Sequence, residues 1–473
     1  MGRCPNIAGT DGVIIAPGRQ GSPCVSVPGG VTRYESMKFC FVWITVFLVA
    51  PFSGKGQEGT VLKPYTGPSN KGVNCATLDG KVMAGYQGWF TTEGDGLGRG
   101  WGHWSKNRRK PFGPGNVTVD LWPDMSEYSE ASRHQTEFKL AGGSPATVFS
   151  SIDKTVVLKH FQWMREYGVD GAFIQRFANG LNRPDSKLHK DIVLSHAREA
   201  ANRNGRAYVV MYDLSGMAAG GTERVWEDWR ELREKMDITG DPAYLHHNGK
   251  PLVSIWGVGF EDYKPRDYTV EECRQLLEKL KADGCSVMLG VPTGWRTLDR
   301  DAVADEALHE AIRLADVVSP WTIGRYRDKK SVAKHKEKCL IPDVKWCRDN
   351  DLDYLPVVFP GFSWFNLHGG ELNAIPREGG QFLWSQMVAA KESGARMIYV
   401  AMFDEVDEGT AIFKCTNDVP VGEEVKFLTY EGKDPDHYLR VTGTGRLMLR
   451  GKVPATKELP KKLVERGRPN LVP

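Results

Sequence analysis

Four acidic side chains fall within five positions in the C-terminal part of the sequence: Asp404, Glu405, Asp407 and Glu408. They follow the apolar run 398–403, which predicts a strand buried on both faces. Carboxylates at the end of a buried strand repel one another and lose hydration, so holding them there has a free-energy cost. The pattern predicts an acid/base pair, and a solvated acidic turn with a helix N-cap at Asp407 is the alternative.

Glu405 and Glu408 have the residue types and spacing for work on a glycosidic bond. That reaction needs one protonated acid near the leaving oxygen and one carboxylate acting on the other side of the sugar. Residues three apart in an extended chain point to opposite faces, so we expect a bend after Phe403, helped by Gly409. Two close carboxyls titrate apart, so one keeps its proton near neutral pH. The spacing leaves retaining and inverting chemistry both open.

Short apolar runs alternate with amphipathic segments eight times from Lys81 onward. We expect strands over residues 82–90, 171–177, 207–214, 252–258, 286–291, 316–321, 354–359 and 397–403. We expect helices over 156–167, 191–204, 222–236, 270–283, 305–315, 331–350 with a break near Pro342, and 380–393. Glycines that precede the next strand predict left-handed helix caps, at Gly168, Gly205, Gly284 and Gly394. Eight such repeats predict an α/β fold of the (β/α)8 TIM barrel type. A doubly wound sheet is the competitor, but no Gly-rich phosphate loop follows the first strand.

Aromatic and ionisable residues recur where the predicted strands end, which is where this fold places its active sites. Aromatic faces stack on sugar rings while charged groups bind hydroxyls, so the pattern indicates a carbohydrate site. The candidate substrate-binding residues are Tyr86, Trp89, His103, Trp104, Arg176, Tyr212, Asp213, Trp256, Trp295, Trp321, Arg325, Trp364 and Asp404.

The composition divides the chain into unequal parts. We expect a non-native extension over residues 1–36, a signal peptide over 37–56, a leading loop over 57–80, the catalytic barrel over 81–418, a small β extension over 419–451 and a flexible tail over 452–473. The signal predicts secretion or a periplasmic location, and a retained N-terminal membrane anchor is the alternative because the apolar run is short.

Charge and cysteine content narrow the function classes. The formal net charge is +3. Removing residues 1–56 takes away five basic and two acidic residues, so the net charge of the remaining chain is zero. A neutral protein argues against nucleic acid as a partner, so we expect a monomer acting on an oligosaccharide or polysaccharide, with no cofactor and no stable membrane insertion after signal cleavage. Six cysteines remain, which permits disulfides; Cys339 and Cys347 are the pair nearest in sequence.

The segment Phe403-Asp-Glu-Val-Asp-Glu-Gly-Thr410 resembles the eighth-strand motif of glycoside hydrolase family 99. The opening Gly85-Tyr-Gln-Gly-Trp89 and the pair His103-Trp104 are similar to the first strand and loop of that family, and family 71 endo-1,3-α-glucanases have a comparable acidic pair. The resemblance to this 71/99-like group implies a (β/α)8 barrel that cleaves α-mannan or α-glucan.

The same resemblance implies a role for each glutamate. Glu405 matches the residue that deprotonates the 2-hydroxyl of the substrate, and Glu408 matches the general acid/base. The chain departs from the family at Val406 and Asp407, where the family has Trp and His. These departures favour a second hypothesis, a carbohydrate-binding barrel without catalysis. A third hypothesis is a calcium site at Asp404, Asp407 and Glu408, although no calcium-loop spacing is present.

Overall fold

The computed structural model of the protein describes residues 61–261, 266–422 and 426–472. The predicted N-terminal extension and signal peptide lie outside the described residues. No helix in the described ranges is long and apolar enough to cross a membrane.

One parallel sheet with eight strand positions forms the centre of the molecule. Its strands are β1 (Val82–Tyr86), β4 (Gly171–Phe177), β5 (Ala207–Asp213), β7 (Lys250–Trp256), β8 (Ser286–Val291), β9 (Val317–Pro320), the half-strands β10 (Asp353–Tyr354) and β11 (Val357–Val358), and β12 (Ile398–Val400). β1 pairs in parallel with both β4 and β12, which closes the ring on that side. The predicted (β/α)8 barrel is confirmed.

The seventh strand position is split at Leu355 and Pro356. β10 pairs with β9, whereas β11 pairs with β12. The backbone continues the ladder across the break, because Leu355 N–H donates to Val318 at 2.9 Å and Tyr399 N–H donates to Pro356 O at 3.0 Å. Proline has no N–H to donate to a neighbouring strand. The chain therefore changes its pairing from β9 to β12 at Pro356.

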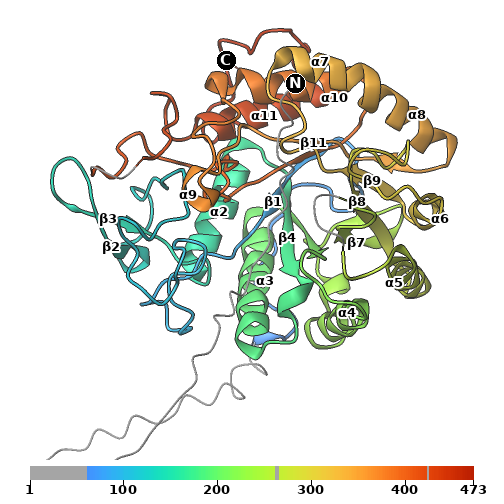
Figure 1. Ribbon diagram of the computed structural model, residues 1–473, viewed down its shortest axis with the longest axis horizontal. Helices are drawn as coiled ribbons and strands as arrows, with labels where there is room; N and C mark the ends of the chain where they lie inside the picture. The colour runs from blue at the N-terminus through green and yellow to red at the C-terminus, as the bar shows by residue number, and fades with distance from the viewer. Residues whose placement is uncertain (1–60, 262–265, 423–425, 473) are drawn as a thin grey trace, which may run out of the picture.

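Helices surround the strands, as Figure 1 shows. They are α2 (Lys154–Tyr167), α3 (Pro184–Asn204), α4 (Thr222–Met236), α5 (Val270–Ala282), α6 (Ala307–Arg313), α7 (Lys329–His335), α8 (Ile341–Asp349), α10 (Gln381–Glu392) and α11 (His437–Leu449). A π-helical turn, Lys336–Leu340, joins α7 to α8 near Pro342, where the sequence predicts a break. The four predicted glycine caps all have positive φ, between 56° and 91°.

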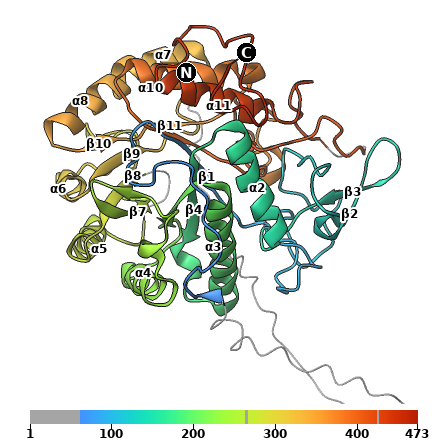
Figure 2. The same ribbon diagram turned by 180° about the vertical axis from the view of Figure 1, so that it is seen from behind.

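Smaller elements fill the connections. They are the antiparallel hairpin of β2 (His134–Lys139) and β3 (Pro145–Val148), the strand β6 (His246–His247), the short helix α9 (Phe365–His368) and the 3-10 turns Glu130–Ser132, Ala178–Gly180, Ile238–Gly240 and Glu378–Gly380. The hairpin lies outside the ring of helices next to α2, as both Figure 1 and Figure 2 show.

The predicted β extension over 419–451 is wrong, because its main element is helix α11. α11 packs between α10 and α2 and also contacts β1, so it is the eighth helix of the barrel. Gly443 and Gly445 suggested a turn, but they allow close packing instead. A Cβ on Gly443 would lie 1.9 Å from the backbone oxygen of Tyr167. The barrel therefore extends past residue 418.

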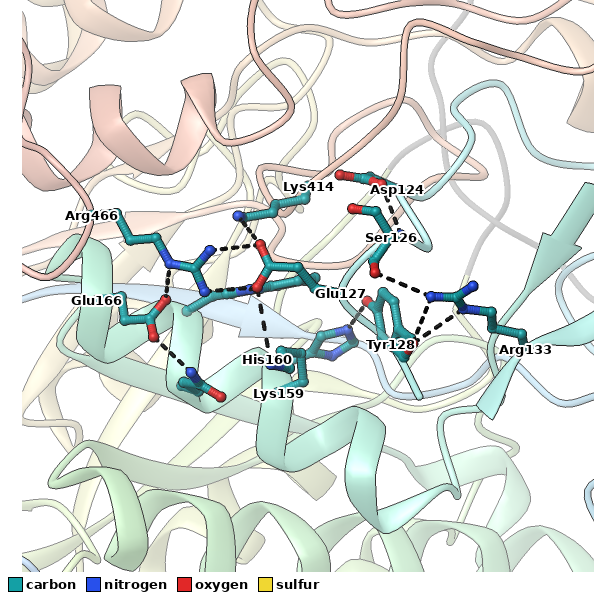
Figure 3. Close-up of polar contacts among 12 residues, drawn as sticks. Asp124, Ser126, Glu127, Tyr128, Arg133, Lys159, His160, Glu166, Lys414 and Arg466 are labelled. Carbon is teal, nitrogen blue, oxygen red and sulfur yellow. Dashed lines mark hydrogen bonds and ion pairs between the residues drawn. The ribbon is translucent and has the colours of Figure 1, made fainter. Parts of the chain in front are cut away.

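The tail over 452–473, predicted to be flexible, is packed against the barrel. Val464 is fully buried, and Arg466 donates to Glu127 at 2.7 and 2.9 Å and to Glu166 at 2.7 Å. Figure 3 shows Arg466 between these two carboxylates, with Lys414 also on Glu127. Burial acts to raise the pKa of Glu127, but the hydrogen bonds from Lys414 and Arg466 outweigh it and lower the pKa to about 2. Ion pairs thus hold a segment whose composition indicated mobility.

The six cysteines of the described chain are free thiols, and all but Cys75 are buried. The disulfides that the even count permits, including Cys339–Cys347, are not present.

We expect Gly443→Ala to lower the free energy of unfolding by about 2 kcal/mol or more, although alanine in a helix interior normally stabilises by about 1 kcal/mol. The added methyl would meet the backbone of α2, which cannot move as a side chain can. Gly445→Ala is the matched control, because its Cβ would meet the flexible end of Met387 and should cost less. Urea denaturation measures both variants, and equal or higher stability for Gly443→Ala would contradict the packing of α11.

Candidate active site

The acidic residues lie on a closed loop that follows β12. Phe403 N–H donates to Gly85 O of β1 at 2.7 Å, and Phe413 N–H returns to Phe403 O at 3.0 Å. Gly409 has a φ of +64°, and Thr410 N–H donates to Glu405 O at 3.1 Å. The predicted bend is present, and residues 406–409 form a turn and not a helix, so Asp407 is not a helix N-cap.

Two other segments hold this loop from outside. The N–H groups of Asp120 and Leu121 donate to Val406 O at 2.9 and 3.2 Å. The Arg377 guanidinium donates to Gly409 O at 2.7 Å and to Ala411 O at 2.8 Å. These contacts give hydrogen-bond donors to carbonyl groups of the loop, and so they fix the backbone that carries the acidic side chains.

Asp404 is bonded within the protein. Its side chain is fully buried and accepts the N–H groups of Gln87 at 2.8 Å and Gly88 at 2.9 Å. Burial raises the pKa of Asp404 to about 7, against the effect of these donors. The prediction that Asp404 binds substrate is wrong, since both of its oxygens are engaged by the first barrel strand's loop.

Glu405 is 3% exposed. One carboxyl oxygen accepts from the side-chain amide of Gln87 and the other accepts from the Thr410 hydroxyl at 2.6 Å. Burial, followed by the charge of Glu408, raises the pKa of Glu405 well above its usual range, while the two donors act in the opposite direction. The two glutamates are therefore electrostatically coupled.

Glu408 keeps a partly exposed side chain. Its pKa is raised to about 8, first by burial and then by the charge of Asp407, while Trp364 acts against the shift and Asp213 adds to it. Asp213 lies at the end of β5, and burial raises its pKa to about 6. The pKa of about 8 means that Glu408 holds a proton at neutral pH, as a general acid must.

Asp407 joins the loop to an aromatic stack. His103 Nδ1 lies 3.3 Å from an Asp407 carboxyl oxygen, and the His103 ring stacks on Trp89 with centroids 3.9 Å apart. Trp89 in turn stacks on Phe177 at the end of β4. The predicted residues Trp89 and His103 are both partly exposed beside the acidic pair.

Three further predicted tryptophans, Trp256, Trp321 and Trp364, are also partly exposed. Trp256 and Trp321 form an edge-to-face pair with centroids 5.3 Å apart. Arg325, which is partly exposed too, donates from Nε to Asp301 at 2.8 Å.

Three predicted binding residues belong to the core instead. Tyr86 is fully buried, and its hydroxyl bonds to His160 Nδ1 at 2.8 Å. Trp104 donates to Phe149 O at 3.2 Å, and Trp295 packs edge-to-face on Trp346. Large aromatic side chains gain most from full burial, so their position near strand ends did not indicate ligand contact.

Arg176 and Tyr212, also predicted to bind substrate, form a buried ionic network. Arg176 donates to Asp228 at 2.9 Å and to Asp191 at 2.8 Å, and the Tyr212 hydroxyl donates to Asp228 at 2.7 Å. A buried arginine needs such partners, because an isolated charge is costly away from water. Both predictions are wrong for this reason.

Sequence reasoning assigned no role to Gln87 and Thr410, the two donors to Glu405. Both stand inside the motifs that carry the family resemblance. A polar side chain directly after a buried strand, as at Gln87, was the available signal.

Several buried polar atoms around the acidic pair have no hydrogen-bond partner. They are the acceptors Gln87 Oε1 and Asp407 Oδ1 and the indole N–H group of Trp89. Buried polar groups are normally paired, so such a set around one loop indicates a place for a polar ligand with both donors and acceptors. Among the residues that the structure describes, no group of three or more His, Cys, Asp or Glu is arranged to hold a metal ion.

No family model and no curated protein matches this sequence. Among solved structures, the chain is similar to the glycoside hydrolase family 99 endo-alpha-mannosidase from Bacteroides thetaiotaomicron, with a TM-score of 0.56, 17% identity, and coverage of 80% of this chain and 99% of that one. A structure of that enzyme in complex with BIS-TRIS-propane gives the same TM-score and identity, with coverage of 80% and 100%. These likenesses show the barrel fold.

We expect Glu408→Gln to raise the free energy of unfolding, by an amount that grows as the pH rises from about 4.5 to about 8. A carboxyl whose pKa is raised by folding stabilises the folded protein less as the pH rises through that window, and glutamine does not titrate. The gain should be on the order of 1–3 kcal/mol at pH 8. Chemical denaturation of both proteins at pH 5 and pH 8 measures it; equal differences at the two values would show that Glu408 has an ordinary pKa.

Proposed function

We propose that this protein is a glycoside hydrolase that cleaves α-linked glycans, of the α-mannan or α-glucan type, with Glu405 and Glu408 as its catalytic residues. The observation that carries the proposal is the pair itself: two coupled carboxyls with raised pKa values on one rigid loop at the carboxyl end of β12. Active sites of (β/α)8 barrels lie at this end of the strands.

Glu408 is the proton donor in this proposal. It is the more exposed of the two glutamates, and it keeps a proton at neutral pH, so it can protonate the leaving glycosidic oxygen. Once the bond breaks, the same carboxylate can take a proton from the incoming water.

Glu405 must be ionised to act as a base, a form that burial and the charge of Glu408 disfavour in the free protein. The Gln87 amide and the Thr410 hydroxyl donate to its two oxygens, which favours the carboxylate. The positive charge that develops on the sugar ring in the transition state favours it further. In the family that the sequence resembles, this residue takes the proton of the substrate's 2-hydroxyl, and we assign the same step to Glu405.

The surroundings of the pair suit a sugar. Partly exposed indole faces can stack on the C–H faces of a pyranose ring, and the unpartnered N–H and carboxyl oxygen atoms can pair with its hydroxyls. Asp407 Oδ1 is the carboxyl oxygen among them. These groups support a polyhydroxylated substrate.

One observation favours a second candidate, a carbohydrate-binding barrel without catalysis. Glu405 is 3% exposed and both of its oxygens are bonded within the protein, so a substrate must displace Gln87 or Thr410 to reach it. A protein that binds oligosaccharides in calorimetry but releases no reducing ends would have this second function.

We expect Glu405→Gln and Glu408→Gln each to lower kcat on α-mannan or α-1,3-glucan oligosaccharides by about 100-fold or more, since a lost acid or base typically has that effect. Reducing-end release measures the rate. The exposed Glu310 on α6 provides the matched control, Glu310→Gln, which should keep wild-type activity. Near-full activity in either active-site variant would remove that glutamate from the mechanism.

We expect kcat/KM to fall as the pH rises above about 8, because Glu408 then loses the proton that it donates. A series of rate measurements from pH 5 to pH 10 on one oligosaccharide gives the profile. A rate that stays level through pH 10 would assign proton donation to another group.

A further inference from the structure

A group of cations lies beside the acidic loop, at the carboxyl ends of β1 and β4. Arg99 is in the long loop after β1, Arg183 directly precedes α3, and Lys190 is in the second turn of α3. Helices of this barrel begin where the strands end, so all three residues are on the active-site side.

Lys190 lacks a counterion. Its Nζ donates to Ser186 Oγ at 2.7 Å and lies 3.5 Å from Ser186 O, one turn earlier in the same helix. No carboxylate in residues 61–261, 266–422 and 426–472 forms an ion pair with Lys190, whereas the nearby Lys187 pairs with Asp191 at 2.8 Å and Glu231 at 3.0 Å. The difference singles out Lys190 as a cation that still needs an anion.

The neighbours of Lys190 add positive charge. Burial, followed by the charges of Arg176, Arg99 and Arg183 in that order, lowers the pKa of Lys190 to about 7. Asp191 and Asp228 are already bound to Arg176, which leaves Asp185, 3.6 Å from Arg99 Nε, as the acid nearest the group. Arg99 Nε and Arg176 Nη1 are both buried and form no hydrogen bond.

Hydrogen bonds join this group to the catalytic loop. Arg99 Nη1 donates to His189 Nδ1 at 2.8 Å, and His189 Nε2 donates to Gly88 O at 2.7 Å. Gly88 N–H donates to Asp404, the residue before Glu405. These bonds connect Arg99 and His189, the residue before Lys190, to the loop that carries the acidic pair.

We propose that Lys190, Arg99 and Arg183 form a subsite for an anionic substituent of the glycan: a sulfate ester, a phosphate ester or a uronic acid carboxylate. An anion there would receive charge-assisted hydrogen bonds from the lysine and arginines, and the Ser186 hydroxyl, which accepts from Lys190, keeps its own hydrogen to donate. The partial positive charge at the start of α3 acts in the same direction.

Gly180 lies directly against the same two polar groups. A Cβ on Gly180 would lie 2.4 Å from Ser186 Oγ and 2.7 Å from Lys190 Nζ, so a larger residue there would displace them. The inference rests on the proposed function for its glycan, but the subsite itself can be tested without hydrolysis.

The probes are sodium sulfate, sodium phosphate and sodium glucuronate, each compared with sodium chloride at equal ionic strength, with binding measured by calorimetry and by the shift in Tm. We expect at least one anion to bind wild-type protein at millimolar concentration, and the preferred one identifies the substituent. Lys190→Met should weaken that binding at least tenfold, and Lys190→Arg should retain most of it.

Lys187→Met is the matched control, because it removes a neighbouring lysine that already has partners, and it should bind the anion as the wild type does. Arg183→Ala, an exposed position, should weaken binding about threefold and is a second test if Lys190→Met does not fold. Equal binding by wild type and Lys190→Met, or no anion effect on the wild type, would overturn the inference. Neither result would contradict the proposed function, which is tested separately by the cleavage of neutral glycans by Glu405 and Glu408.

Discussion

Two hydrogen bonds from the backbone of Gln87 and Gly88 to the buried carboxyl of Asp404 are the contact on which the site depends. They join the loop after the first strand to the loop after the eighth, across the line where the barrel closes. The bonded carboxyl fixes Gln87, and the Gln87 side chain then holds Glu405. A buried carboxyl has a large free-energy cost, and these N–H groups offset part of it.

The four acidic side chains differ in their hydrogen bonds and exposure although they are neighbours in sequence. Asp404 uses both oxygens inside the protein, Glu405 uses both on side chains, Asp407 uses one, and Glu408 remains partly exposed. Along one turn the four acids thus range from fully bonded to partly exposed. Sequence alone shows four equivalent carboxylates, because partners such as Gln87, Gly88 and His103 are distant from them in the chain.

The barrel was predictable because burial on both faces gives parallel strands an apolar run and leaves each helix one apolar face. α11 was missed for the opposite reason: it is buried on nearly all sides, so it has no polar face, and its glycines resemble a turn. Strand ends were located to within a few residues. The direction of each side chain could not be predicted. The buried residues Tyr86, Trp104 and Arg176 therefore could not be distinguished by sequence from the partly exposed Trp89 and Trp256. A residue's neighbours in space decide that, and they come from other elements.

The position of α11 has a consequence for biosynthesis. This helix contacts β1, the first strand of the barrel to be translated. β1 also pairs with β12, which is translated last among the barrel strands. A nascent chain therefore exposes one unpaired edge of β1 until nearly the whole barrel has been translated, and parallel closure of this kind is slow. Chaperone dependence during translation should follow from this topology, and a ribosome that stalls before α11 would release an open, aggregation-prone sheet.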